Sequence, residues 1–149
     1  LCICDGLGPA LLMQRAILHL MRTLDFEKHV EGLRREYRSR RDRMLRLAEE
    51  RLTPFGLRTN RPKGGFFIWG QGPDDMRGFN SAAFARYAVQ HKGIGLIPGS
   101  VFFPDGDDSG DRAFRLSYAR IPLDCMGEGM DRLARAWRTY RAHRHEDRE

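Results

Sequence analysis

The spacing of apolar residues along the chain predicts more helix than strand. Four segments have apolar residues at helical spacing: 8–22, 25–52, 80–91 and the stretch from 124 onward. Three short runs rich in aromatic and β-branched residues predict strands: 62–70, 94–99 and 113–119. The resulting order is helix, helix, strand, helix, strand, strand, helix. It predicts an α+β fold in which helices pack on a small, partly antiparallel sheet.

Two of these elements have especially regular patterns. Within 113–119, Phe114, Leu116 and Tyr118 alternate with Arg115, which predicts a strand with one buried face. The last helix carries one apolar stripe, made of Met130, Leu133, Ala134, Trp137 and Tyr140. Because both tryptophans follow the apolar periodicity, we expect Trp69 and Trp137 to pack in the core.

The boundaries of the helices are marked by residues with suitable backbone chemistry. Thr23 and Asp25 offer oxygens that can cap the long second helix, and Asn80 or Ser81 can cap the third. Gly93 stands where a left-handed residue commonly ends a helix. The long helix has an apolar side made of Phe26, Val30, Leu33, Tyr37, Met44, Leu47 and Leu52.

Composition and charge narrow the function classes. The chain has 149 residues, is 41% hydrophobic and has a net charge of +6, which indicates a single globular domain. Between Arg34 and Arg51 there are eight arginines and four acidic residues. We interpret this strip as a solvated helix face with pairs such as Glu31 and Arg35. A nucleic-acid surface is the alternative, and it is less favoured because no aromatic residues are interleaved with the charges.

The sequence offers no convincing metal site. The three cysteines, Cys2, Cys4 and Cys125, are odd in number and lack a second ligand pair at zinc spacing. His143 and His145 are likewise not predicted to bind metal. The acidic segment 104–112 begins like a calcium loop, but Leu116 stands where a glutamate is required, so a hairpin-like loop is expected. No apolar run is long enough to span a membrane, and the N-terminus does not resemble a signal peptide. These features favour a reducing, cytoplasmic location.

Three motifs in fixed order carry a family resemblance: Pro62-x-Gly64-Gly65-x-Phe67-x-Trp69, Gly95-x-x-Pro98-Gly99-x-x-Phe102-Phe103 and Phe114-Arg115-Leu116-Ser117-Tyr118. Together they resemble the C-terminal third of class I/II, fold type I aminotransferases that depend on pyridoxal phosphate. The branch of 2-aminoadipate transaminases and aminotransferase-like regulators is the most similar. The resemblance implies the small C-terminal domain of that fold, preceded by a long interdomain helix. It implies 1–24 as the end of the large-domain segment and connecting helix, and 25–149 as the small domain.

The resemblance also implies a substrate contact. Arg115 matches the family arginine that holds the α-carboxylate of the amino acid. A guanidinium can give two parallel charge-assisted hydrogen bonds to a carboxylate, which fixes the orientation of the substrate as well as its charge. A salt bridge from Arg115 to Asp111 is the structural alternative. Gly64 and Gly65 have two interpretations: they let the backbone approach substrate, or they permit a positive φ where the strand begins.

One residue required for transamination is absent from the sequence. The family needs a lysine bonded covalently to pyridoxal phosphate. The only lysines are Lys28, Lys63 and Lys92, and none stands in a segment that resembles the family motif. We therefore expect that the cofactor is held mainly by an absent large domain, that the chain is part of a longer protein, and that it does not catalyse transamination alone.

The same resemblance sets expectations for the whole protein. It implies an aminotransferase that moves an amino group between an amino acid and a 2-oxo acid, and a homodimer. The alternative is an effector-binding, aminotransferase-like domain of a transcriptional regulator, because both classes share this C-terminal sequence. The identity of the amino acid cannot be read from these residues.

Overall fold

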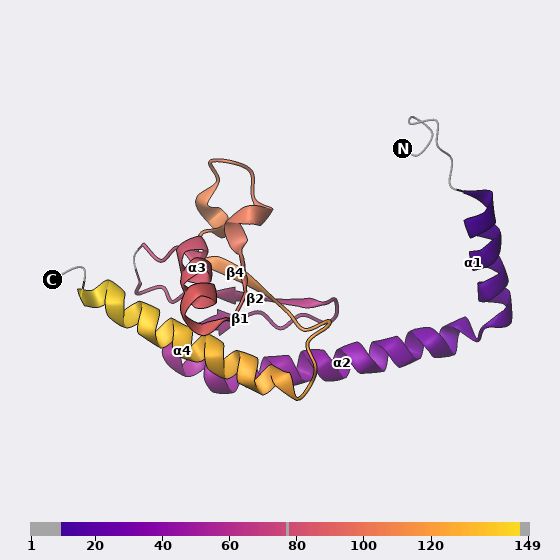
Figure 1. Ribbon diagram of the computed structural model, residues 1–149, viewed down its shortest axis with the longest axis horizontal. Helices are drawn as coiled ribbons and strands as arrows, with labels where there is room; N and C mark the ends of the chain where they lie inside the picture. Colours follow the sequence, from indigo (N-terminus) through magenta and orange to yellow (C-terminus); the bar gives the residue numbers. More distant parts are fainter. Residues whose placement is uncertain (1–9, 77, 147–149) are drawn as a thin grey trace. The chain divides into compact units, whose positions relative to one another are not determined.

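A computed structural model describes residues 10–76 and 78–146, with side chains as far as residue 143 (Figure 1). Cys2 and Cys4 lie outside the described residues, as does the side chain of His145. Contacts along the chain divide it into two units, with the division between Glu36 and Tyr37. The domain boundary implied at residue 25 stays a prediction.

The first unit is helical. It contains α1 (Leu11–Thr23) and the beginning of α2 (Phe26–Arg51), separated by Leu24, whose backbone is extended. The Asp25 carboxylate accepts a hydrogen bond from the Lys28 amide at 3.1 Å, which confirms the predicted cap of the long helix. Phe26 and Leu33 belong to the apolar side predicted for α2, and both are exposed. Of the residues of α2, only Met44, Leu47 and Ala48 are buried. Helical periodicity shows which side chains share a face of the helix, but it does not show whether another element covers that face.

The second unit contains a four-stranded sheet among its described residues. Its strands are β1 (Arg58–Thr59), β2 (Phe67–Gln71), β3 (Ile97–Pro98) and β4 (Ala113–Ser117). Their order is β1-β2-β4-β3. Every pairing is antiparallel, where the sequence predicted a partly antiparallel sheet. The hairpin-like connection predicted over 104–112 is confirmed, because it links β3 to its antiparallel neighbour β4.

The strands differ from the sequence prediction in length and number. β1 was missed because two residues, Arg58 and Thr59, are too few to show an alternating pattern. β2 begins at Phe67 rather than at Pro62, since the chain bends before it and Gly65 adopts a positive φ of 90°. β3 is limited to two residues, and Pro98 has no amide hydrogen to extend the ladder.

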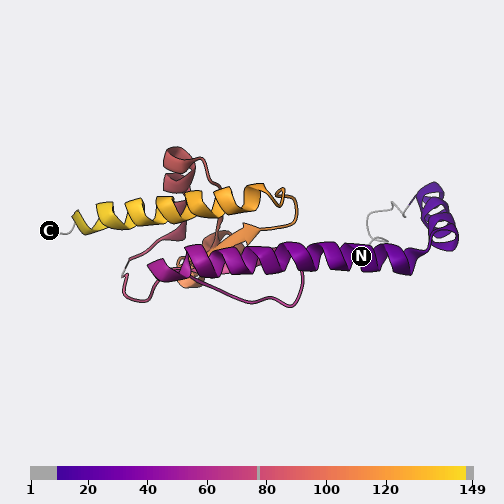
Figure 2. The same cartoon turned by 90° about the horizontal axis from the view of Figure 1, so that it is seen from below.

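Helices cover one face of this sheet and form the core with it. The buried face carries Ile68, Phe114 and Leu116. Against it pack α3 (Ser81–Lys92) and α4 (Cys125–Glu146), and α4 runs alongside the C-terminal half of α2 (Figure 2). All five residues of the stripe predicted on the last helix are buried, which confirms it. The predicted helix ends at Asn80 and Gly93 are confirmed as well.

The two tryptophans have different environments. Trp137 on α4 is fully buried and donates a hydrogen bond from Nε1 to the Phe55 carbonyl at 3.0 Å. Trp69 is only half-buried and lies on the sheet face opposite Ile68, so its prediction as a core residue was wrong. Period-2 alternation assigns Trp69 and Ile68 to opposite faces, and only the tertiary structure shows which face the helices cover.

Gly99 allows two backbone segments to approach closely after β3. A Cβ at this position would lie 2.7 Å from the Ala113 carbonyl oxygen and would also collide with the Gly110 carbonyl oxygen. We therefore expect Gly99→Ala to lower the free energy of unfolding by about 1–3 kcal/mol, the range for overpacking a well-packed site. Urea unfolding of the chain, followed by circular dichroism, measures this loss.

The matched control for Gly99 is Gly95→Ala. A Cβ at Gly95 has no atom within 4 Å, and its φ is not positive. This variant should unfold within about 0.5 kcal/mol of the unsubstituted chain. Equal losses in both variants would contradict a close-approach role for Gly99.

Candidate functional site

The sheet face away from the helices carries the residue implied as the substrate contact. Arg115 follows Phe114 and precedes Leu116, whose side chains are buried, so alternation directs Arg115 to the opposite face. Trp69 of β2 is its direct partner in the antiparallel register. Phe67 shares this face because it is two residues from Trp69. The face therefore combines one cation with two aromatic side chains.

The guanidinium of Arg115 is held between two aromatic rings. Its Cζ lies 3.9 Å from the centroid of the Phe67 ring and 4.5 Å from that of Phe102. Phe102 comes from the short helical turn that follows β3, and its ring also contacts Trp69 edge-on at 5.2 Å between centroids. Cation–π attraction to both rings restricts the arginine and removes part of its hydration.

Arg115 has no anionic partner among the described residues. The Asp111 carboxylate, the structural alternative for its charge, instead accepts a weak hydrogen bond from the Asn80 amide at 3.4 Å. The Nε of Arg115 is buried and has no hydrogen-bond partner in the described part of the chain. A partly desolvated guanidinium without a carboxylate nearby is a favourable site for an incoming carboxylate.

The glycine pair lies in the bend that leads into β2. Tyr118 donates a hydrogen bond from Oη to the Gly65 carbonyl at 2.8 Å, and Arg41 donates one to the Lys63 carbonyl at 2.6 Å. Burial raises the pKa of Tyr118, so its hydroxyl stays a donor at neutral pH. Gly65 has a positive φ, whereas Gly64 does not. Both are exposed, and the space where a Cβ would stand is open. A backbone contact from Gly64 or Gly65 to substrate stays a prediction.

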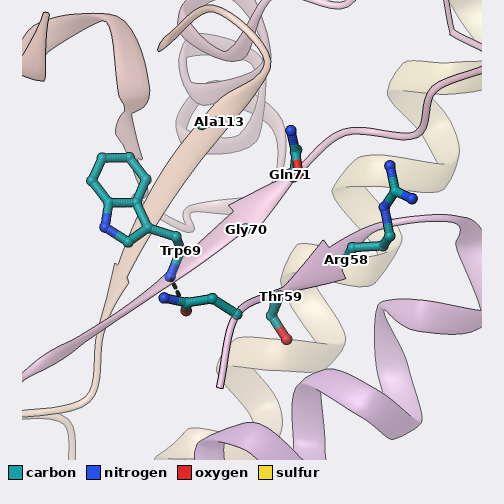
Figure 3. A pocket seen from close by; sticks show the side chains of 7 residues that line it. Arg58, Thr59, Trp69, Gly70, Gln71 and Ala113 are labelled. Carbon is teal, nitrogen blue, oxygen red and sulfur yellow. Dashed lines mark hydrogen bonds between the residues drawn. The ribbon is translucent and has the colours of Figure 1, made fainter. Parts of the chain in front are cut away.

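A shallow hollow of about 610 Å³ lies beside Trp69 on the sheet (Figure 3). It is lined by Arg58, Thr59, Asn60, Trp69, Gly70, Gln71 and Ala113. The Asn60 side-chain oxygen accepts a hydrogen bond from the Trp69 amide at 2.9 Å, which joins the end of β1 to β2. Sequence reasoning missed this hollow because β1 was missed.

Sequence reasoning also missed the roles of Phe67 and Phe102. Phe102 entered the sequence analysis only as part of a family motif, and the structure shows that its ring contacts Arg115. Alternation with buried Ile68 could have placed Phe67 beside Arg115, but no local signal links Phe102 to β4.

Several arginines of the strip on α2 form hydrogen bonds or ion pairs with other residues of the chain. Arg40 donates to the Ile121 carbonyl at 2.6 Å, and Arg51 pairs with Asp131 at 3.2 Å. The pair predicted between Glu31 and Arg35 is present at 3.8 Å. Most of these contacts are exposed and contribute little to stability individually.

The lysines of the chain do not fit a covalent pyridoxal phosphate site. Lys28 is exposed on α2, Lys63 lies in the loop before β2, and Lys92 is in the last turn of α3. None belongs to a strand of the sheet that carries Arg115.

The described residues contain no group of three or more His, Cys, Asp or Glu side chains placed to hold a metal ion. Among their helices, none combines the length and apolar character that crossing a bilayer requires. Cys125 is an exposed free thiol.

The helices and the small antiparallel sheet match the C-terminal portion of fold type I aminotransferases. No family model matches the chain. Its relatives and structural neighbours show that it belongs to the pyridoxal-phosphate-dependent aminotransferases.

The sequence relatives are similar over most of this chain. A 2-aminoadipate transaminase from Thermus thermophilus is 33% identical over 125 residues, which are 84% of this chain and 30% of that protein. An aspartate aminotransferase from Pyrococcus abyssi is 32% identical over 87% of this chain and 31% of its own length. The chain thus spans about a third of the length of these relatives.

A solved structure shows the same arrangement of elements. The α-aminoadipate aminotransferase from Thermus thermophilus, complexed with N-(5'-phosphopyridoxyl)-L-leucine, superposes with a TM-score of 0.74 at 32% identity. The match covers 85% of this chain and 30% of that one. An archaeal alanine:glyoxylate aminotransferase matches with a TM-score of 0.71 at 28% identity, over 82% of this chain and 29% of its own.

Proposed function

We propose that this chain is the substrate-carboxylate-binding portion of an aminotransferase that moves an amino group between an amino acid and a 2-oxo acid. The observation that carries the proposal is the guanidinium of Arg115, which is restrained between Phe67 and Phe102 and has no ion pair in the described residues. Its relatives, which are named for amino-group transfer, support the same reaction.

Arg115 would hold and orient the substrate. Two parallel hydrogen bonds from a guanidinium fix a carboxylate in one plane, so the bonds at the neighbouring Cα take a defined direction. Phe67 and Phe102 limit the movement of that guanidinium and keep part of its surface away from water. The α-carboxylate is common to all amino acids, so this contact supports binding without selecting a side chain.

Pyridoxal phosphate, when bound to an aminotransferase, supplies the electron sink for amino-group transfer. In our proposal its lysine and most of its binding residues belong to other parts of the protein, because Lys28, Lys63 and Lys92 do not fit that role. The 149 residues alone would then be inactive. The proposal includes a homodimer in the cytoplasm, and the exposed apolar residues of α1 are compatible with further association.

The test uses the complete reading frame that encodes this chain. The purified protein is mixed with pyridoxal phosphate, and its visible absorbance is recorded with and without amino acids. A bound-cofactor band that changes with amino acids, together with formation of the 2-oxo acid, supports the proposal. A protein that binds the cofactor but forms no 2-oxo acid would contradict the enzyme proposal and favour the regulatory alternative.

A further inference from the structure

The bend before β2, here called the glycine bend (residues 62–66), is held by hydrogen bonds to its backbone carbonyl groups. Gly64 and Gly65 are exposed, and the positions where a Cβ would stand face open space. Glycine has no side chain to pack and loses more conformational freedom on folding than any other residue. Arg41 of α2 donates to the Lys63 carbonyl and holds the beginning of the bend. The two glycines need a separate anchor.

Tyr118 supplies that anchor from the core. Its side chain is fully buried, and its hydroxyl donates to the Gly65 carbonyl at 2.8 Å and lies 3.4 Å from the Gly64 carbonyl oxygen. The Tyr118 amide also donates to the Phe66 carbonyl at 3.0 Å. Because close-packed neighbours hold the ring, its hydroxyl has a fixed position, and the end of the bend is held against it.

The glycine bend leads directly to an aromatic ring that contacts Arg115. Phe67 is the first residue of β2 and comes two residues after Gly65. The centroid of its ring lies 3.9 Å from Cζ of Arg115. Since Phe67 is at the end of its strand, its position depends on the backbone that precedes it. A displacement of Gly65 would therefore move the Phe67 ring relative to the guanidinium.

We propose that Tyr118 is a positioning residue for the carboxylate site. Its hydroxyl fixes Gly65, the bend then holds Phe67 in place, and Phe67 keeps the guanidinium of Arg115 in the orientation that receives a carboxylate. This inference rests on the proposed function, because it takes Arg115 as the carboxylate contact. Tyr118 acts through Gly65 and Phe67, not by contact with the ligand.

The test measures the binding of hexanoate to the complete protein that carries this chain. Hexanoate has a carboxylate but no amino group, so it can occupy the site without undergoing amino-group transfer. Tyr118→Phe removes only the hydroxyl and keeps the buried ring. Isothermal titration calorimetry should give a dissociation constant about 3- to 10-fold higher than for the unsubstituted protein, the range set by the loss of one neutral hydrogen bond.

A double-mutant cycle with Phe67→Leu tests the route through Phe67. If Tyr118 acts through that ring, Tyr118→Phe should raise the dissociation constant by less than about 1.5-fold in the Phe67→Leu background. The same several-fold increase in both backgrounds would overturn the inference. An unchanged dissociation constant in Tyr118→Phe would overturn it as well, even if the urea unfolding midpoint fell, because the hydroxyl would then have only a structural role.

The matched control is Tyr87→Phe. Tyr87 lies on α3, which packs on the sheet face opposite Arg115, so loss of its hydroxyl should leave the dissociation constant within about twofold. An increase as large as in Tyr118→Phe would show that the effect is not specific to the glycine bend.

The proposed function is tested separately by formation of a 2-oxo acid by the unsubstituted protein. If no 2-oxo acid forms but hexanoate binding depends on Tyr118 as expected, the enzyme proposal fails and the positioning role stands. If the unsubstituted protein does not bind hexanoate, the positioning role is overturned.

Discussion

In the full-length aminotransferase that we propose, Arg115→Ala is expected to lower kcat/KM for the amino acid by about 10²- to 10⁴-fold. The guanidinium would give a substrate carboxylate two charge-assisted hydrogen bonds, and each is worth about 1.5–3 kcal/mol. Each 1.36 kcal/mol corresponds to about a factor of ten in rate. Steady-state kinetics with varied amino acid measures the effect, and the visible spectrum shows the amino-acid concentration at which the cofactor band changes.

Two variants make the Arg115 prediction specific. Arg115→Lys keeps the charge but loses the two-pronged geometry, so its kcat/KM should lie between those of the parent and Arg115→Ala. Arg86→Gln removes an exposed arginine on α3 and should leave kcat/KM within about twofold, as expected for a surface change far from the site. A decrease in Arg86→Gln as large as in Arg115→Ala would show that general charge, rather than a carboxylate contact, supports activity.

Trp137→Ala is expected to lower the free energy of unfolding of the chain by about 3–5 kcal/mol, the range for removing a buried aromatic side chain. Trp137 is fully buried and has ring contacts to Phe79 and Phe84, with centroids 5.2 and 5.3 Å away. Its loss would also leave the Phe55 carbonyl without the indole donor. Because about 5–15 kcal/mol is a typical total for a domain, this variant should be largely unfolded or strongly destabilised in urea titrations.

Trp69→Ala is the matched control, since it removes the same side chain from the open face of the sheet. Trp69 is half-buried and outside the core, so we expect a loss of about 1 kcal/mol or less. Circular dichroism at increasing urea concentrations compares the two variants directly. If Trp69→Ala destabilised the chain as much as Trp137→Ala, the assignment of the core to the opposite sheet face would be wrong.

Local chemistry explains which parts of the fold were predictable. Asp25 and Asn80 cap helices through their own side-chain oxygens, and Gly93 ends α3 with a left-handed backbone. These features need only neighbouring residues. The alternation around Arg115 also appeared in the sequence, because side chains on a strand point to opposite faces in turn.

Other features depend on residues far apart in the chain. β1 exists because Arg58 and Thr59 pair with Gln71 and Gly70, and two residues leave no pattern of their own. The close approach at Gly99 requires Gly110 and Ala113, which the β3–β4 connection brings back to it. A local pattern cannot show such contacts.

The candidate site also combines features set by neighbouring residues with features set by residues far apart in the chain. The sequence placed Arg115 on a strand and, through the family resemblance, matched it to a carboxylate-binding arginine. Only the tertiary structure placed Phe67 and Phe102 against its guanidinium and showed that Asp111 does not pair with it. The sequence by itself determined the helices, the principal strands and the alternation that separates Arg115 from the core. The tertiary structure decided which sheet face is open, because helix packing and strand pairing join segments that are distant in the sequence.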